Sequence, residues 1–197
     1  MTHAAATGHL ETSTGLDNRK LLMWLFLGSE CLFFGSLIAA YLLYRDRSVV
    51  GPYPEDVFDI PFTSVSAFVL LMSSVCMVLA LAAIQRGDRR GLQIWLLATA
   101  TLGILFLSGQ AFEFTEFDRE GLRLHTNLFG TTFFVLTGFH GAHVTIGVLI
   151  LLSLFAWSLQ GRIQQKDSLN VELAGLYWHF VDIVWIVIFT LVYLIQP

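Results

Sequence analysis

Two histidines, His140 and His143, lie three residues apart in the apolar sequence "TGFHGAHVTIG". This spacing places both side chains toward one face of a helix. The imidazoles could hydrogen-bond to a neighbouring helix, as polar side chains between packed membrane helices often do. They could instead ligate zinc, copper or iron, but such a site needs three or four converging ligands. We take the helix contact as the simpler interpretation and keep the metal site as the alternative.

A second pair with the same spacing is His179 and Asp182, in "WHFVDIVW". One interpretation is a structural contact between imidazole and carboxyl, within one helix or between two. The other is a proton relay, because ionisable groups inside membranes often carry protons.

Two carboxyl groups and one amide complete the polar set within apolar sequence. Glu30 lies near the middle of the first apolar run, where a proton-linked or lipid-linked role competes with a structural hydrogen bond. Gln110 and Glu113 lie three residues apart in "SGQAFEF", and contact with water is the leading interpretation for Glu113. The predicted buried polar network consists of His140, His143, His179, Asp182, Gln110 and Glu113. We predict no catalytic residue and no metal ligand in this chain.

These residues fall in five apolar runs, each long enough to cross a bilayer, for which a helix needs about 20 residues. The runs are Leu21 to Tyr44, Phe62 to Ile84, Leu92 to Phe114, Phe129 to Trp157 and Leu173 to Ile195. Because helices satisfy their own backbone groups in lipid, we predict an all-α integral membrane bundle of five transmembrane helices. Residues 1–19 are predicted to form a polar, solvated tail, and residues 20–197 a single transmembrane domain.

The basic residues predict an orientation. The end of the bundle that carries the N-terminal tail has Arg19, Lys20, Arg86, Arg89, Arg90, Arg162 and Lys166, whereas the other end has Arg45, Arg47, Arg119 and Arg123. Because basic residues concentrate on the cytoplasmic side, we predict the N-terminus inside and the C-terminus outside. The chain of 197 residues is 55% hydrophobic and only 13% charged, and its net charge of −4 gives no reason to expect nucleic acid.

Small residues at helical spacing predict close helix packing. In the fourth run, Gly138 and Ala142 lie four apart, as do Thr137, Gly141 and Thr145. Gly28, Gly35 and Ala39 mark a comparable face on the first run.

Four of the five runs carry motifs that resemble subunit III of the haem-copper terminal oxidases, in its five-helix bacterial form. The motifs are "FLGSECLFF", "SGQAFEF", "GTTFFVLTGFHGAHVTIG" and "YWHFVDIVW", in the order that the family shows. The resemblance implies a chain without haem or copper that packs beside subunit I, which holds the haems and the oxygen-reducing copper site, and that joins subunit II and other oxidase subunits. It also implies bound phospholipid and a role in sustaining proton uptake. Glu30 matches the family's membrane-embedded glutamate, and the polar residues of the last two runs match its polar positions.

The number of spans departs from the seven-helix members, in which two further helices form one wall of the lipid cleft. We expect a non-catalytic subunit of a proton-pumping cytochrome c oxidase in a bacterial cell membrane, and "SECLFF" with Glu30 favours cytochrome c as the electron donor. The alternatives are a subunit of a quinol oxidase or of a nitric oxide reductase. An alternative from another class of protein is a small membrane metalloenzyme that uses the histidines and Asp182 as metal ligands.

Overall fold

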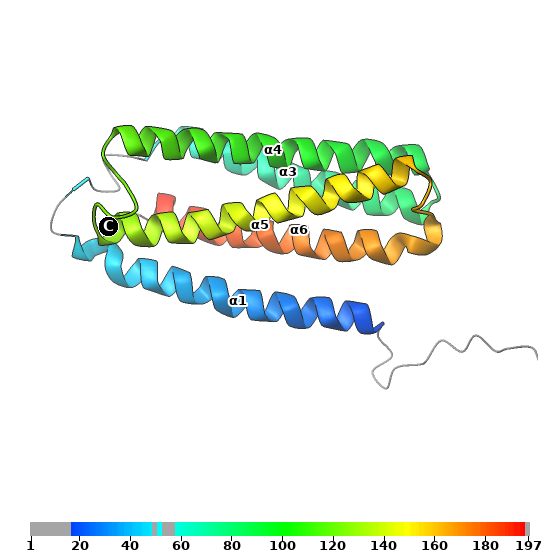
Figure 1. The fold of residues 1–197 in the computed structure, drawn as a ribbon, viewed down its shortest axis with the longest axis horizontal. Helices are drawn as coiled ribbons and strands as arrows, with labels where there is room; N and C mark the ends of the chain where they lie inside the picture. The colour runs from blue at the N-terminus through cyan, green and yellow to red at the C-terminus, as the bar shows by residue number, and fades with distance from the viewer. Residues whose placement is uncertain (1–16, 49–50, 53–57, 196–197) are drawn as a thin grey trace, which may run out of the picture.

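The chain forms a bundle of long helices in the computed structural model, which describes residues 17–48, 51–52 and 58–195 (Figure 1). The long helices are α1 (Asn18–Tyr44), α3 (Ile60–Gln85), α4 (Arg89–Arg119), α5 (Leu128–Leu159) and α6 (Ser168–Ile188), which continues as a π-helical segment, η3 (Phe189–Leu194). Two short 3₁₀ helices are η1 (Arg45–Arg47) and η2 (Gln165–Asp167). Five helices are long and apolar enough to cross a membrane, which confirms the predicted all-α bundle. Residues 1–16 of the predicted tail lie outside the described residues.

Four helices begin at an Asp or Asn whose side chain caps the first turn. Asp17, Asp59, Asp88 and Asn127 each accept a hydrogen bond from a backbone N–H two or three residues later, at 2.7–3.1 Å. Such caps satisfy N–H groups that have no partner within the helix. These helices therefore begin shortly before the apolar runs. The capping residues set the first turn of each helix, whereas the apolar run marks only the part that can cross the lipid.

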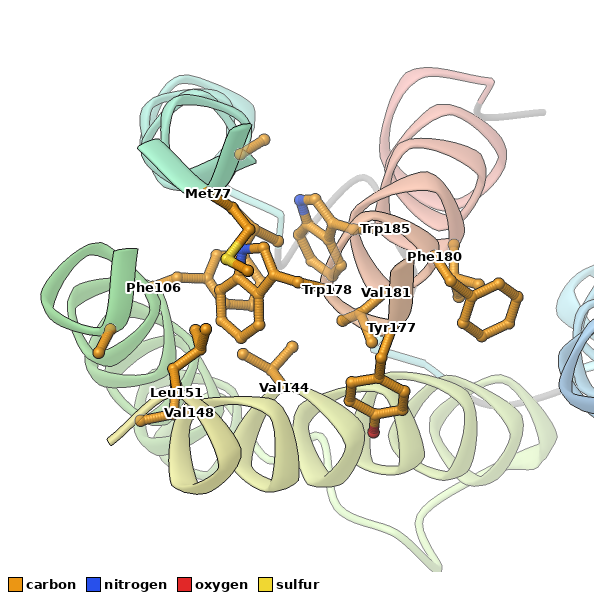
Figure 2. Close-up of a cluster of buried hydrophobic side chains, with 14 of the residues drawn as sticks. Met77, Phe106, Val144, Val148, Leu151, Tyr177, Trp178, Phe180, Val181 and Trp185 are labelled. Carbon is orange, nitrogen blue, oxygen red and sulfur yellow. The ribbon is translucent and has the colours of Figure 1, made fainter. Parts of the chain in front are cut away.

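The core forms where the two tryptophans of α6 enter the space between the other helices. Figure 2 shows Trp178 and Trp185 among side chains of α3, α4 and α5. Two glycines make room for the indole of Trp178: a Cβ at Gly103 would lie 2.6 Å from Cη2, and one at Gly147 would lie 2.7 Å from Cε3. Backbone from α4 and α5 thus approaches the indole more closely than any side chain would permit.

Helix α1 is the least buried of the five long helices. In its most apolar stretch 11% of the residues are buried within the chain, compared with 56% in the helical stretch Gln165–Leu194. Figure 1 shows α1 along one side of the bundle, where it packs against α5 and α6.

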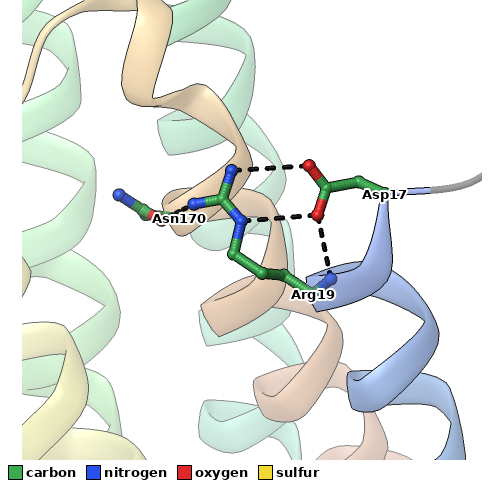
Figure 3. A network of polar contacts seen from close by, with 3 residues as sticks. All are labelled: Asp17, Arg19 and Asn170. Atoms are coloured by element: carbon green, nitrogen blue, oxygen red, sulfur yellow. Dashed lines mark hydrogen bonds and ion pairs between the residues drawn. The ribbon is translucent and has the colours of Figure 1, made fainter. Parts of the chain in front are cut away.

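Polar contacts hold α1 at both of its ends. At its N-terminal end, Arg19 lies between the Asp17 carboxyl and the Asn170 side chain of α6 at 3.4 Å from each (Figure 3), and Lys20 pairs with Glu172. At the C-terminal end of α1, Arg45 donates to the carbonyl of Ile195 at 2.9 Å.

The predicted small-residue faces are partly wrong. Gly141 does meet another helix, since a Cβ there would lie 2.7 Å from the Gln110 side chain of α4. A Cβ at Gly28, Gly35 or Gly138 would meet nothing within 4 Å, so these residues do not serve helix packing within this chain. The reason is that small residues permit a close approach, whereas the positions of the neighbouring helices decide whether it occurs.

Candidate functional site: polar groups within the bundle

Glu30 of α1 faces His143 of α5. Oε2 of Glu30 lies 3.2 Å from Nε2 of His143, and the two side chains are 18% and 15% exposed. On the other side of the imidazole, Nδ1 lies 2.8 Å from the carbonyl oxygen of Phe139. A carbonyl oxygen only accepts, so Nδ1 carries a hydrogen and Nε2 is the nitrogen that meets the carboxyl. The contact becomes an ion pair when the imidazole is protonated and the carboxyl is ionised.

The Glu30–His143 pair borders a groove of about 460 Å³ between α1, α5 and α6. Apolar side chains line most of it, including Met23, Phe26 and Ile146. Tyr177 of α6 closes one side and donates its hydroxyl hydrogen to the His143 carbonyl at 3.0 Å. The pair thus lies at the edge of a mostly apolar groove, to which Asn170 adds a further polar side chain.

His179 and Asp182 are joined through a third residue, Ser74 of α3. The Ser74 hydroxyl lies 2.9 Å from Nδ1 of His179 and donates to Oδ2 of Asp182. Because a hydroxyl has one hydrogen to donate, Nδ1 of His179 is the donor to Ser74. The predicted contact between imidazole and carboxyl is therefore a chain of hydrogen bonds from His179 through Ser74 to Asp182.

The serine was missed by sequence reasoning, although it belongs to the "LLMSS" segment. Its neighbour Ser73 accepts a hydrogen bond from Nε1 of Trp178 at 2.8 Å. Two adjacent hydroxyls on α3 therefore serve three polar residues of α6. A pair of serines in an apolar run is the available signal, but it does not reveal which helix they face.

Gln110 and Glu113 of α4 each contact a different helix. Nε2 of Gln110 donates to the carbonyl of Thr137 on α5 at 2.9 Å. The carboxyl of Glu113 accepts a hydrogen bond from the hydroxyl of Thr63 on α3 and is only 6% exposed. The expectation that water solvates Glu113 is wrong, because the start of α3 runs beside this end of α4 and covers the carboxyl.

His140 differs from His143 in its polar contacts, although the ring of Phe34 meets both imidazoles. Its side chain is fully buried, and its ring stacks on Trp185 with centroids 4.9 Å apart and an angle of 23°. Neither ring nitrogen has a hydrogen-bond partner in the protein. Three residues correspond to about 300° of helix rotation, so the two imidazoles point about 60° apart. One faces α1, and the other faces the aromatic core.

The polar residues do not form one continuous hydrogen-bonded network. The hydrogen bonds and ion pairs of the described residues join them as Glu30–His143, His179–Ser74–Asp182, Gln110–Thr137 and Glu113–Thr63. Within residues 17–48, 51–52 and 58–195, no group of three or more His, Cys, Asp or Glu side chains is arranged to hold a metal ion. The arrangement suits contacts between helices.

Comparison with known proteins agrees with this arrangement of helices and motifs. Residues 3–196 match the family described as cytochrome c oxidase subunit III. The chain belongs to this family. It is a multi-pass bacterial membrane protein and a subunit of a haem-copper oxidase complex, as the resemblance of the four motifs predicts.

The relatives include subunits of cytochrome c oxidases and of quinol oxidases, and each aligns with the chain over most of its length. It is 38% identical to cytochrome c oxidase subunit 3 of Bacillus sp. (strain PS3), over 90% of this chain and 86% of the relative. It is 44% identical to cytochrome c oxidase subunit 3 of Synechocystis sp., over 91% and 76%. It is also 36% identical to quinol oxidase subunit 3 of Bacillus spizizenii, over 98% and 95%.

Proposed function

We propose that this chain is the non-catalytic subunit III of a proton-pumping cytochrome c oxidase in the bacterial cytoplasmic membrane. It packs beside subunit I, which carries the haem and copper centres, in a complex that also contains subunit II. The observation that carries the proposal is the match of residues 3–196 to the subunit III family. In addition, most polar residues of the candidate site contact another helix, and no three His, Cys, Asp or Glu side chains among the described residues are arranged to hold a metal ion. The chain supports proton uptake by subunit I and the stability of the complex.

The role of Glu30 follows from its place on α1. It is paired with His143, yet it borders an open apolar groove, so its carboxyl lies at the surface of the bundle within the membrane. A titratable pair in this position can exchange a proton with a partner that covers the groove, because no other helix among the described residues covers it. Glu30 is therefore the proton-linked or lipid-linked residue of the chain.

Membrane lipid is the second partner. A further groove of about 540 Å³ lies on the other side of α1, lined by apolar residues of α1 and α6 and by His179. Both grooves are suited to the acyl chains of structural phospholipids. In this five-helix chain the two grooves beside α1 take the place of the cleft for which the longer members need two more helices.

A quinol oxidase is the second candidate, because a relative that matches 98% of this chain is named quinol oxidase subunit 3. The metalloenzyme alternative receives no support from the described residues, which offer no set of three ligands.

Mild solubilisation and affinity capture through this chain test the proposal. We expect a larger haem-containing subunit to co-purify. In a cytochrome c oxidase, reduced cytochrome c should reduce its haem and change the haem absorption spectrum. In a quinol oxidase, a quinol should do so instead. Metal analysis of the captured material after removal of the larger subunits should find no stoichiometric iron, copper or zinc. Recovery of the chain alone, or of metal that is lost in a His140→Ala/His143→Ala variant, would overturn the proposal.

A further inference from the structure

The buried polar side-chain atoms that have no hydrogen-bond partner in the described part of the chain belong to one residue of α5 and two residues of α6. They are both ring nitrogens of His140, Oδ1 of Asp182 and Nε1 of Trp185. These side chains are at most 3% exposed. Buried polar groups in native proteins are nearly always hydrogen-bonded, either to protein or to ordered water.

Two of the three residues are in contact between α5 and α6, and the third, Asp182, lies less than one turn from Trp185 along α6. The imidazole of His140 stacks on the indole of Trp185 at 4.9 Å. Asp182 and Trp185 lie three apart on α6, a spacing that brings side chains together on one face of a helix. Figure 2 shows the indole of Trp185 projecting from α6 toward α3, the helix that carries Ser74.

The surroundings offer these atoms no alternative partner. The rings of Phe34 and Phe106 meet the imidazole of His140 edge to face, with centroids 6.5 Å and 5.9 Å away. The indole of Trp185 packs on the same Phe106 at 4.8 Å. An indole N–H only donates, a carboxyl oxygen accepts, and a neutral imidazole does one of each. Water, with two hydrogens and two lone pairs, complements this mixture of donors and acceptors.

We propose that this place is an internal hydration site. One water molecule accepts a hydrogen bond from Nε1 of Trp185 and donates one to Oδ1 of Asp182, and water also serves the ring of His140. Buried waters of this kind typically bridge two to four polar groups. The site continues the chain His179–Ser74–Asp182 from the groove beside α1 into the aromatic core. The inference rests on the chain's own polar atoms and does not depend on the proposed oxidase function.

The test is a map of the intact complex, by cryo-electron microscopy or crystallography, at a resolution that shows internal waters elsewhere. We expect density about 2.7–3.2 Å from both Oδ1 of Asp182 and Nε1 of Trp185. A map that shows other interior waters but none here would overturn the proposal. Direct pairing of His140, Asp182 and Trp185 with one another or with other protein groups would do the same.

Two matched variants sharpen the test. Trp185→Phe removes the donor and should abolish or displace the water at Asp182. Trp178→Phe removes an indole N–H that Ser73 already satisfies, so the water at Asp182 should remain. If Trp185→Phe prevents assembly, the map of the unaltered complex decides by itself. Equal density at Asp182 in both variants would contradict the proposed role of the Trp185 N–H.

Discussion

At the residue scale, the partner of Glu30 decides what its carboxyl can do. The sequence left a proton-linked or lipid-linked role and a structural hydrogen bond open for Glu30 and did not indicate its partner, which is His143, 3.2 Å away on a different helix. An imidazole within reach lowers the cost of placing a carboxyl among apolar side chains, as does the partly exposed position beside the groove. The Glu30–His143 pair therefore does two things: it connects α1 to α5, and it places a titratable carboxyl at the surface of the bundle.

The first prediction concerns this pair. We expect Glu30→Gln to assemble normally, because an amide has the shape of a protonated carboxyl and can still contact the imidazole. Without the carboxyl of Glu30, however, the complex should lose activity several-fold faster during turnover. The measurements are the haem content of the purified complex and its activity over time. Ser36→Ala is the control, since Ser36 lies exposed on α1 and bonds only to the Phe33 carbonyl of its own helix. Loss of the complex in Glu30→Gln would show that the carboxyl is structural.

The second prediction concerns Ser74. Replacing it by alanine removes the donor to Oδ2 of Asp182, whose other oxygen has no protein partner, and the acceptor for His179. We expect a loss of stability of about 1–3 kcal/mol, the usual cost of a buried polar group left unpaired. It would be measured as a lower midpoint of thermal inactivation of the complex. Ser153→Ala, which removes only a bond to the carbonyl of Leu149 in the same helix, should have little effect. Equal midpoints in the two variants would contradict the role of Ser74.

At the scale of elements, the glycines of α5 divide into two kinds. Gly147 accepts the indole of Trp178, whereas Gly138 faces open space. The sequence shows both as glycine in one apolar helix, so composition cannot distinguish them. The difference arises because α6 places a tryptophan opposite one glycine and nothing opposite the other.

The third prediction compares alanine at these two positions. Gly147→Ala should destabilise by about 1–3 kcal/mol, because the methyl group would overlap the indole and the core would have to shift. Gly138→Ala should be neutral or stabilising by up to about 1 kcal/mol, since alanine favours the helix and has room within this chain. Both substitutions lie on the same helix and change propensity equally, so each controls the other. Thermal denaturation of the purified complex measures them, and a cost at Gly138 that equals the cost at Gly147 would refute this account.

At the scale of the whole molecule, the chain divides into α1 and the bundle of α3 to α6. Ionic and backbone contacts fix α1 at its two ends, and two apolar grooves flank its middle. The surface left open is where lipid or a partner subunit would lie. Most buried aromatic residues of the described chain belong to α4, α5 and α6, so the aromatic core lies mainly outside α1.

The fourth prediction concerns orientation. Basic residues are more numerous at the end of the bundle that carries Arg19 and Lys20, which predicts an inside N-terminus and an outside C-terminus. Alkaline phosphatase fused after Pro197 should be active, because this enzyme folds outside the cytoplasmic membrane. The same enzyme fused in the turn at Gly87 should be inactive. The opposite result at both positions would reverse the orientation.

The sequence by itself determined the class of the fold and the family. Five apolar runs of sufficient length can satisfy their backbone groups in lipid only as helices, and the motifs that carry Glu30, His140 and Asp182 are specific to one family. It also determined which residue types are costly in the membrane. Tertiary structure alone decided their partners: Glu30 with His143, Ser74 with both His179 and Asp182, and no protein partner for His140. The reason is geometric, because helical spacing fixes which residues share a face, while the packing of separate helices fixes what that face meets.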